Sequence, residues 1–144
     1  MKQVAVITPY YKESIEVLAQ AHESVMSQGG DVTHFLISDG FPKKEIDAWN
    51  AKHIKLPNAH GDNGNTPRGI GGILAAAQGY DFVAYLDADN WFHEGHIESL
   101  LDVQAKTGAN ISCSMRTYHA MDGTLLAGVT EPDENNLQHV DTSC

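Results

Sequence analysis

The stretch Phe82-Val83-Ala84-Tyr85-Leu86-Asp87-Ala88-Asp89 most constrains the fold, because largely apolar residues run directly into two acids. The apolar half is short and rich in aromatic and branched side chains, which is typical of a strand buried in the centre of a sheet. Such a strand cannot carry ionised carboxylates in its middle without a large desolvation cost. Asp87 and Asp89 are therefore predicted to lie where the strand ends, at the edge of an α/β sheet where ligands bind.

Two acids at such an edge are typical of a divalent cation held by one or two carboxylates together with substrate phosphates. The same residues also fit an ordinary strand followed by a turn rich in Asp and Asn. This short pattern does not separate the two interpretations, so the rest of the chain has to decide between them.

Charge and composition narrow the classes of function. The chain has 144 residues, a formal net charge of −10 and two cysteines. The acidic balance argues against nucleic-acid binding, and an anionic substrate would have to be met by a metal or a few local cations. The cysteine count fits a reducing compartment. The first apolar run is too short for a secretory signal, and none approaches the ~18 residues of a membrane span. We expect a cytoplasmic protein, either free or peripheral at the inner face of a membrane.

Hydrophobic patterning predicts strands and helices in alternation. Strands are expected at 4–8, 33–38, 53–56 and 82–86, helices at 14–26, 43–52, 68–78 and 95–107, and a strand pair at 110–118 and 124–129. A further strand is expected to begin near 137. The alternation predicts an α/β fold with a mostly parallel sheet and helices on both faces.

Two features precede the acid pair. The polar loop 57–67 is long for a compact domain, and such loops are often functional. Gly69, Gly71 and Gly72 lie in the first turns of the helix expected at 68–78. Each costs about 1 kcal/mol relative to alanine there, so we expect a backbone or a ligand to approach this helix closely.

Polar and aromatic residues follow the first, second and fourth strands, whose ends can meet over one crevice. Those ends carry Thr8-Pro9-Tyr10-Tyr11, Ser38-Asp39-Gly40 and Asp87-Ala88-Asp89. Arg68 opens the next helix, where a guanidinium can bind an anion together with free N–H groups. A nucleoside diphosphate joined to a neutral group would use all of these features.

The order and spacing of these segments resemble the family-two glycosyltransferases over about residues 4–107. The matching segments are Val6-Ile7-Thr8-Pro9-Tyr10-Tyr11-Lys12, Ser24-Val25-Met26-Ser27-Gln28, Ile37-Ser38-Asp39-Gly40, the run from Asn63-Gly64 to Arg68-Gly69, and Tyr85-Leu86-Asp87-Ala88-Asp89-Asn90. The last is close to that family's Leu-Asp-Ala-Asp-Asp signature, which contains a DXD motif. The resemblance implies a GT-A, Rossmann-like fold and transfer of a sugar from a nucleoside-diphosphate donor, with a UDP-sugar favoured.

The resemblance implies roles for the residues of the base and diphosphate pocket. Tyr11 would stack on or border the base, and the backbone of Thr8 and Pro9 would form the wall beside it. Asp39 would hydrogen-bond the base. Arg68 would steady the diphosphate.

The resemblance also assigns the acid pair. Asp87, with Ala88 beside it, would contact the ribose, and Asp89 would hold Mn²⁺ or Mg²⁺ against the diphosphate. The acceptor, whether a sugar, a lipid or a protein, is not indicated by the sequence.

The sequence departs from the family pattern at Ser38 and Lys12, which replace the usual acid and asparagine. An inverting transfer also needs a late carboxylate as general base. Asp141 is the one weak candidate for it, and His139 is a weak candidate for a metal ligand, although both also fit an ordinary polar strand face.

We therefore expect a single domain over 1–144, in which 4–107 bind the donor and 108–144 begin an acceptor part that is cut short by truncation. A fragment of this kind would bind a nucleotide but transfer sugar slowly.

Two other functions remain open. A sugar-phosphate nucleotidyltransferase shares the general architecture, but it carries a Gly-rich loop with Arg and Lys after the first strand, which Pro9-Tyr10-Tyr11-Lys12 lacks. A binding module that holds the nucleotide sugar without catalysis would keep the donor site and lack the base. Fold alone does not distinguish these functions.

Overall fold

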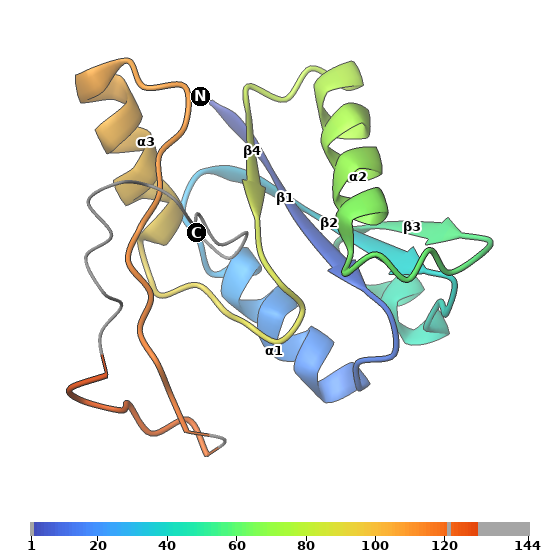
Figure 1. Ribbon diagram of the computed structural model, residues 1–144. Coiled ribbons are helices and arrows are strands. Elements are labelled where there is room, and N and C mark those ends of the chain that lie inside the picture. Colours follow the sequence, from blue (N-terminus) through green and yellow to red (C-terminus); the bar gives the residue numbers. More distant parts are fainter. Residues whose placement is uncertain (1, 121, 130–144) are drawn as a thin grey trace.

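Four parallel strands form the sheet of this protein, in the order β3-β2-β1-β4 (Figure 1). The computed structural model describes residues 2–120 and 122–129. The strands are β1 (Gln3–Tyr10), β2 (Asp31–Asp39), β3 (Lys52–Leu56) and β4 (Phe82–Tyr85). This order places the carboxyl ends of β2, β1 and β4 side by side. The α/β class and the parallel sheet predicted from the sequence are confirmed.

Helices cover both faces of the sheet because β1 is apolar on both of its sides. Val4 and Val6 belong to the core on the side of α1 and α3, whereas Ala5 and Ile7 pack on the side of α2. In Figure 1, α2 and α3 accordingly lie on opposite sides of β4. The helices are α1 (Ile15–Met26), α2 (Asn65–Ala77) and α3 (His96–Thr107).

The glycines of α2 allow the helix to pack closely on the sheet. A Cβ atom at Gly71 would lie 2.5 Å from Ile7 Cγ2 and 2.7 Å from Ile37 Cδ1, and one at Gly72 would lie 3.0 Å from the Tyr85 hydroxyl. At Gly71 and Gly72 the close neighbours are therefore side chains of the sheet rather than another backbone, whereas the space around Gly69 is open. The close packing fixes the first turn of α2 at the edge where the strands end.

Two helix boundaries differ from the sequence-based prediction. The helix expected at 43–52 is the five-residue 3₁₀ helix η1 (Lys44–Ala48). Lys52 belongs to β3 instead, where it pairs with Phe35 of β2. Helix α2 begins at Asn65 rather than at Arg68, because the Asp62 carboxylate accepts hydrogen bonds from the Thr66 N–H at 2.9 Å and its hydroxyl at 2.6 Å.

The prediction for the last strands is wrong in two respects. β4 is half-buried and lies at the edge of the described sheet rather than in its centre. The expected pair at 110–118 and 124–129 reduces to one isolated bridge between His119 and Leu125. A turn at Asp122 does form, but a two-stranded ribbon without a covered face is marginally stable in water. The strand expected near 137 lies outside the described residues.

Candidate functional site

A cleft of about 450 Å³ lies at the carboxyl ends of β1, β2 and β4, beside the first turn of α2. Each strand contributes the residues that directly follow or end it, and the loop between β3 and α2 closes the remaining side. The chemistry-bearing side chains among its lining residues are Tyr11, Glu13, Asp39, Arg68, Asp87 and Asp89. The structure therefore brings together residues that the sequence placed at three separate strand ends.

Asp39 ends β2 and is nearly buried, with 6% of its side chain exposed. Its Oδ1 accepts a hydrogen bond from His60 Nδ1 at 2.7 Å, and the His60 backbone N–H lies 3.1 Å from both carboxylate oxygens. Burial alone would raise the pKa of Asp39, but the hydrogen bonds from the His60 side chain and backbone outweigh it and hold the pKa below its usual value. Asp39 is therefore ionised at neutral pH and acts as an acceptor.

Tyr11 follows β1 and presents an aromatic ring that is 40% exposed. The ring of Phe41 meets it edge-on, with 4.7 Å between the centroids, and Lys12 Nζ lies within 4.8 Å of both ring centroids. The Glu13 carboxylate accepts a hydrogen bond from the Tyr11 N–H at 2.6 Å. These contacts hold an exposed aromatic surface at the mouth of the cleft, suited to stacking against a planar ligand.

Arg68 lies in the first turns of α2, and its guanidinium forms an ion pair with Asp87. The same guanidinium donates a hydrogen bond to the Asn63 carbonyl at 2.7 Å. Asn63 and Gly64 both have positive φ, and Gly64 packs against Arg68 and Pro9. Arg68 therefore connects the loop before α2 to the end of β4.

Asp89 is exposed in the cleft, whereas Ala88 between the two acids is 5% exposed and packs into the core below. No group of three or more His, Cys, Asp or Glu residues in the described part of the chain is arranged to hold a metal ion. A hard cation such as Mg²⁺ is commonly held by one or two carboxylates plus the phosphates of its substrate. The oxygen donor of Asp89 fits that incomplete kind of site.

Residues 5–141 match the profile of Glycosyl transferase family 2.

The chain belongs to glycosyl transferase family 2.

The glycosyltransferase domain is also similar to a solved structure, that of S. aureus TarS. The TM-score is 0.60 and the sequence identity 16%, over 80% of this chain and 24% of that chain. At this identity the likeness concerns the fold alone, and it confirms the GT-A-type fold. A search of curated proteins finds none that matches. Within the described residues, no helix combines the length and the apolar character needed to cross a membrane.

One residue expected to serve the site of this glycosyltransferase domain, Thr8, does not lie in the cleft. Thr8 does not line it, because its buried side chain faces the other way and hydrogen-bonds His34 Nε2 at 2.8 Å. Its neighbour Pro9 does line the cleft. Asp141 and His139 lie outside the described residues.

The sequence assigned no individual role to several lining or supporting residues: Glu13, His60, Asp62, Asn63 and Gly64. The length and polarity of the loop 57–67 were the available signal for all of them except Glu13. Glu13 had no such signal, because its role depends on how the chain turns after β1.

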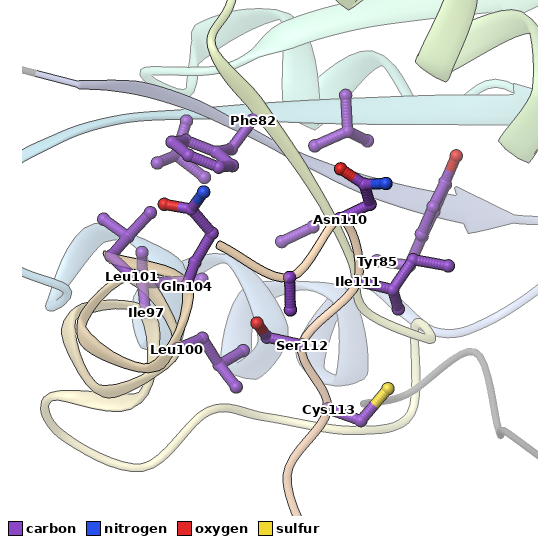
Figure 2. Close-up of a pocket in the computed structure, with 14 residues that line it drawn as sticks. Phe82, Tyr85, Ile97, Leu100, Leu101, Gln104, Asn110, Ile111, Ser112 and Cys113 are labelled. Carbon is purple, nitrogen blue, oxygen red and sulfur yellow. The ribbon is translucent and has the colours of Figure 1, made fainter. Parts of the chain in front are cut away.

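A second cavity, of about 300 Å³, lies between β4, α3 and the segment 109–113 (Figure 2). Figure 2 shows Ile97, Leu100 and Leu101 of α3 on one side of it and Ile111 to Cys113 near the other. Its lining is mostly apolar and includes no acidic or basic side chain. Of these two cavities, the cleft at the strand ends is therefore the one with charged side chains to meet a charged ligand.

Proposed function

We propose that this family 2 domain binds a nucleoside-diphosphate sugar, with a UDP-sugar favoured, and transfers the sugar to an acceptor with the help of a divalent cation. One observation carries the proposal. A single cleft gathers an exposed aromatic ring (Tyr11), an ionised acceptor (Asp39), an arginine-held carboxylate (Asp87) and an exposed acid (Asp89). A base, a ribose and a metal-bound diphosphate need these groups in one place.

Asp39 supports the choice of base. An ionised carboxylate only accepts hydrogen bonds, so its ligand must present a donor, and we propose that this donor is the ring N–H of the base. Uracil and guanine carry a protonated ring nitrogen, whereas the corresponding ring nitrogens of cytosine and adenine are acceptors. Uracil is our first choice and guanine the second, with Tyr11 stacking on the base.

Asp87 and Asp89 support the remainder of the donor. Asp87 is held by Arg68 through Oδ1, which leaves Oδ2 to accept a ribose hydroxyl. A diphosphate beside these acids would be repelled unless a cation lay between them. Asp89 would hold Mn²⁺ or Mg²⁺ there, and the bound ion would supply Lewis-acid stabilisation of the departing nucleoside diphosphate.

The acceptor step needs a further group. A carboxylate must take the proton from the acceptor hydroxyl, and the acceptor must be positioned for attack. Asp141 is the one candidate that the sequence offers for that base, although it also fits an ordinary polar strand face. We propose a sugar, lipid or protein acceptor, since the acidic chain disfavours a nucleic acid.

A panel of nucleoside diphosphates tests the donor site. In thermal shift with Mn²⁺, UDP should raise the melting temperature most, GDP less, and CDP and ADP least, because a ligand that binds only the native state stabilises it. Tyr11→Ala should reduce the UDP shift. Equal shifts for all four nucleotides, or none, would contradict the proposal. Release of UDP from UDP-sugars with added acceptors then tests the transfer.

A further inference from the structure

The sheet register places the loop after β3 next to Asp39. Asp39 and Leu56 are paired residues at the ends of β2 and β3, so the chain that leaves Leu56 starts beside the carboxylate. Gly40 then lets the loop come close. Its φ is +86°, and a Cβ atom there would lie 2.5 Å from Ala59 N. The loop backbone therefore lies directly against Gly40, and His60 comes next in the chain.

His60 holds the carboxylate through two different donors. Its backbone N–H is shared between both oxygens of Asp39, and its ring Nδ1 lies 2.7 Å from Oδ1. An ionised carboxylate cannot donate, so the ring nitrogen must carry the hydrogen. Of the hydrogen bonds from His60, Oδ1 accepts two and Oδ2 accepts one. The backbone N–H of Gly61 also bonds this carboxylate. We take Oδ2, which accepts only the shared backbone hydrogen bond from His60, as the oxygen that accepts from a ligand.

We infer that His60 is a positioning residue that selects the base of the donor through Asp39. By fixing Oδ1 it keeps the carboxylate ionised and presents Oδ2 as the acceptor for a ring N–H. This inference rests on the proposed function and adds the residue that controls its specificity. Nothing in the sequence outside the loop 57–67 indicates that role.

The inference predicts a change in selectivity as well as in affinity. Without the ring of His60, the nearly buried carboxylate of Asp39 loses its shortest hydrogen bond. Protonation of Asp39 then becomes easier, and a protonated carboxyl can donate to the ring nitrogen of cytosine. The ratio of UDP affinity to CDP affinity should therefore become smaller.

Calorimetry of UDP and CDP binding with Mn²⁺ compares wild type, His60→Ala and His60→Asn. His60→Ala should weaken UDP about 10-fold, the usual size of losing a hydrogen bond to a charged group, and CDP less. The amide N–H of His60→Asn can reach the same oxygen, so this variant should recover most of the affinity and the selectivity. His93→Ala, at an exposed histidine that does not line the cleft, is the matched control and should behave like wild type.

A double-mutant cycle with Asp39→Asn tests whether His60 acts through Asp39. In that background His60→Ala should cause no further loss of selectivity. An equal loss in both backgrounds, or no loss in either, overturns the inference.

Carbon NMR titration of the Asp39 carboxyl needs no ligand and separates this inference from the proposed function. The pKa of Asp39 should rise in His60→Ala and return towards the wild-type value in His60→Asn. An unchanged pKa in His60→Ala overturns the positioning role. If the wild-type protein binds no nucleoside diphosphate, the proposed function fails and the titration alone decides what His60 does to Asp39.

Discussion

Arg68 and Asp87 form an ion pair although 19 positions separate them in the chain. Their side chains are 14% and 26% exposed, so both charges are largely removed from water. Arg68 also donates to the Asn63 carbonyl, so the loop before α2 and the end of β4 hold each other in place. Steadying a diphosphate with Arg68, as expected from the sequence, stays a prediction. What the structure shows is that Arg68 forms an ion pair with Asp87.

Replacing Arg68 should destabilise the protein and weaken donor binding together. In Arg68→Ala, the partly buried carboxylate of Asp87 loses its cation partner, which should cost about 1–3 kcal/mol of unfolding free energy. Urea denaturation of Arg68→Ala, Asp87→Ala and the double variant measures the coupling, which should be about 1 kcal/mol. Additive losses would show that the ion pair contributes nothing of its own.

Asp89 should control the metal dependence of donor binding without affecting the fold. Because its side chain is exposed, Asp89→Asn should change the unfolding free energy by less than about 0.5 kcal/mol. Calorimetry should show that Mn²⁺ strengthens UDP binding to wild type but not to this variant. Asp102→Asn, at an exposed acid of α3, is the matched control and should keep the metal dependence. Metal-independent UDP binding by wild type would contradict the assignment.

The sequence predicted the elements that repeat a simple pattern. Alternating apolar strands and amphipathic helices define the class, and Asp39, Arg68 and Asp87 were placed in one cleft because parallel strands end at one edge of a sheet. The position of β4 was not predictable in the same way. An apolar run shows that a strand can be buried, but its neighbours in the sheet are set by the rest of the fold.

The supporting residues of the cleft could not be predicted from local patterns. His60 reaches Asp39 only because β3 ends opposite it and Gly40 lets the loop approach. Glu13 contacts a backbone N–H through a turn that no periodicity describes. The helix expected at 43–52 also failed for a non-local reason, since Lys52 pairs with Phe35 in the sheet.

The glycines of α2 offer a matched pair of substitutions. Gly71→Ala should destabilise the protein by about 1–3 kcal/mol, because the added Cβ would overlap Ile7 and Ile37 in a packed core. Gly69→Ala should instead stabilise it by about 0.5–1 kcal/mol, since the space around Gly69 is open and alanine favours the helix. Urea denaturation measures both variants. Effects of the same sign would contradict the close packing of α2 on the sheet.

A pair of histidines lies on the side of β1 that Thr8 faces, opposite Pro9 of the cleft. His34 is fully buried, and its ring is held by Thr8 Oγ1 at 2.8 Å and by His22 Nδ1 at 2.9 Å. His22 stacks between His34 and Trp49. Burial, with a smaller contribution from nearby His22, lowers the pKa of His34 to about 3, and burial also lowers the pKa of His22.

These histidines should make the protein sensitive to mild acid. In the unfolded chain His34 binds a proton below about pH 6.5, whereas in the folded protein it stays neutral down to about pH 3. The unfolding free energy therefore falls as pH falls through this window, and His34 does not affect it at higher pH. The contribution of His34 alone should lower the unfolding free energy by about 2 kcal/mol between pH 6.5 and 5. Urea denaturation at each pH measures this change. His34→Gln should be less stable than wild type at pH 7, because it replaces a buried ring that is hydrogen-bonded to Thr8 and His22. It should lose less stability on acidification, because glutamine does not titrate. Equal slopes for the two proteins would show that other groups cause the acid sensitivity.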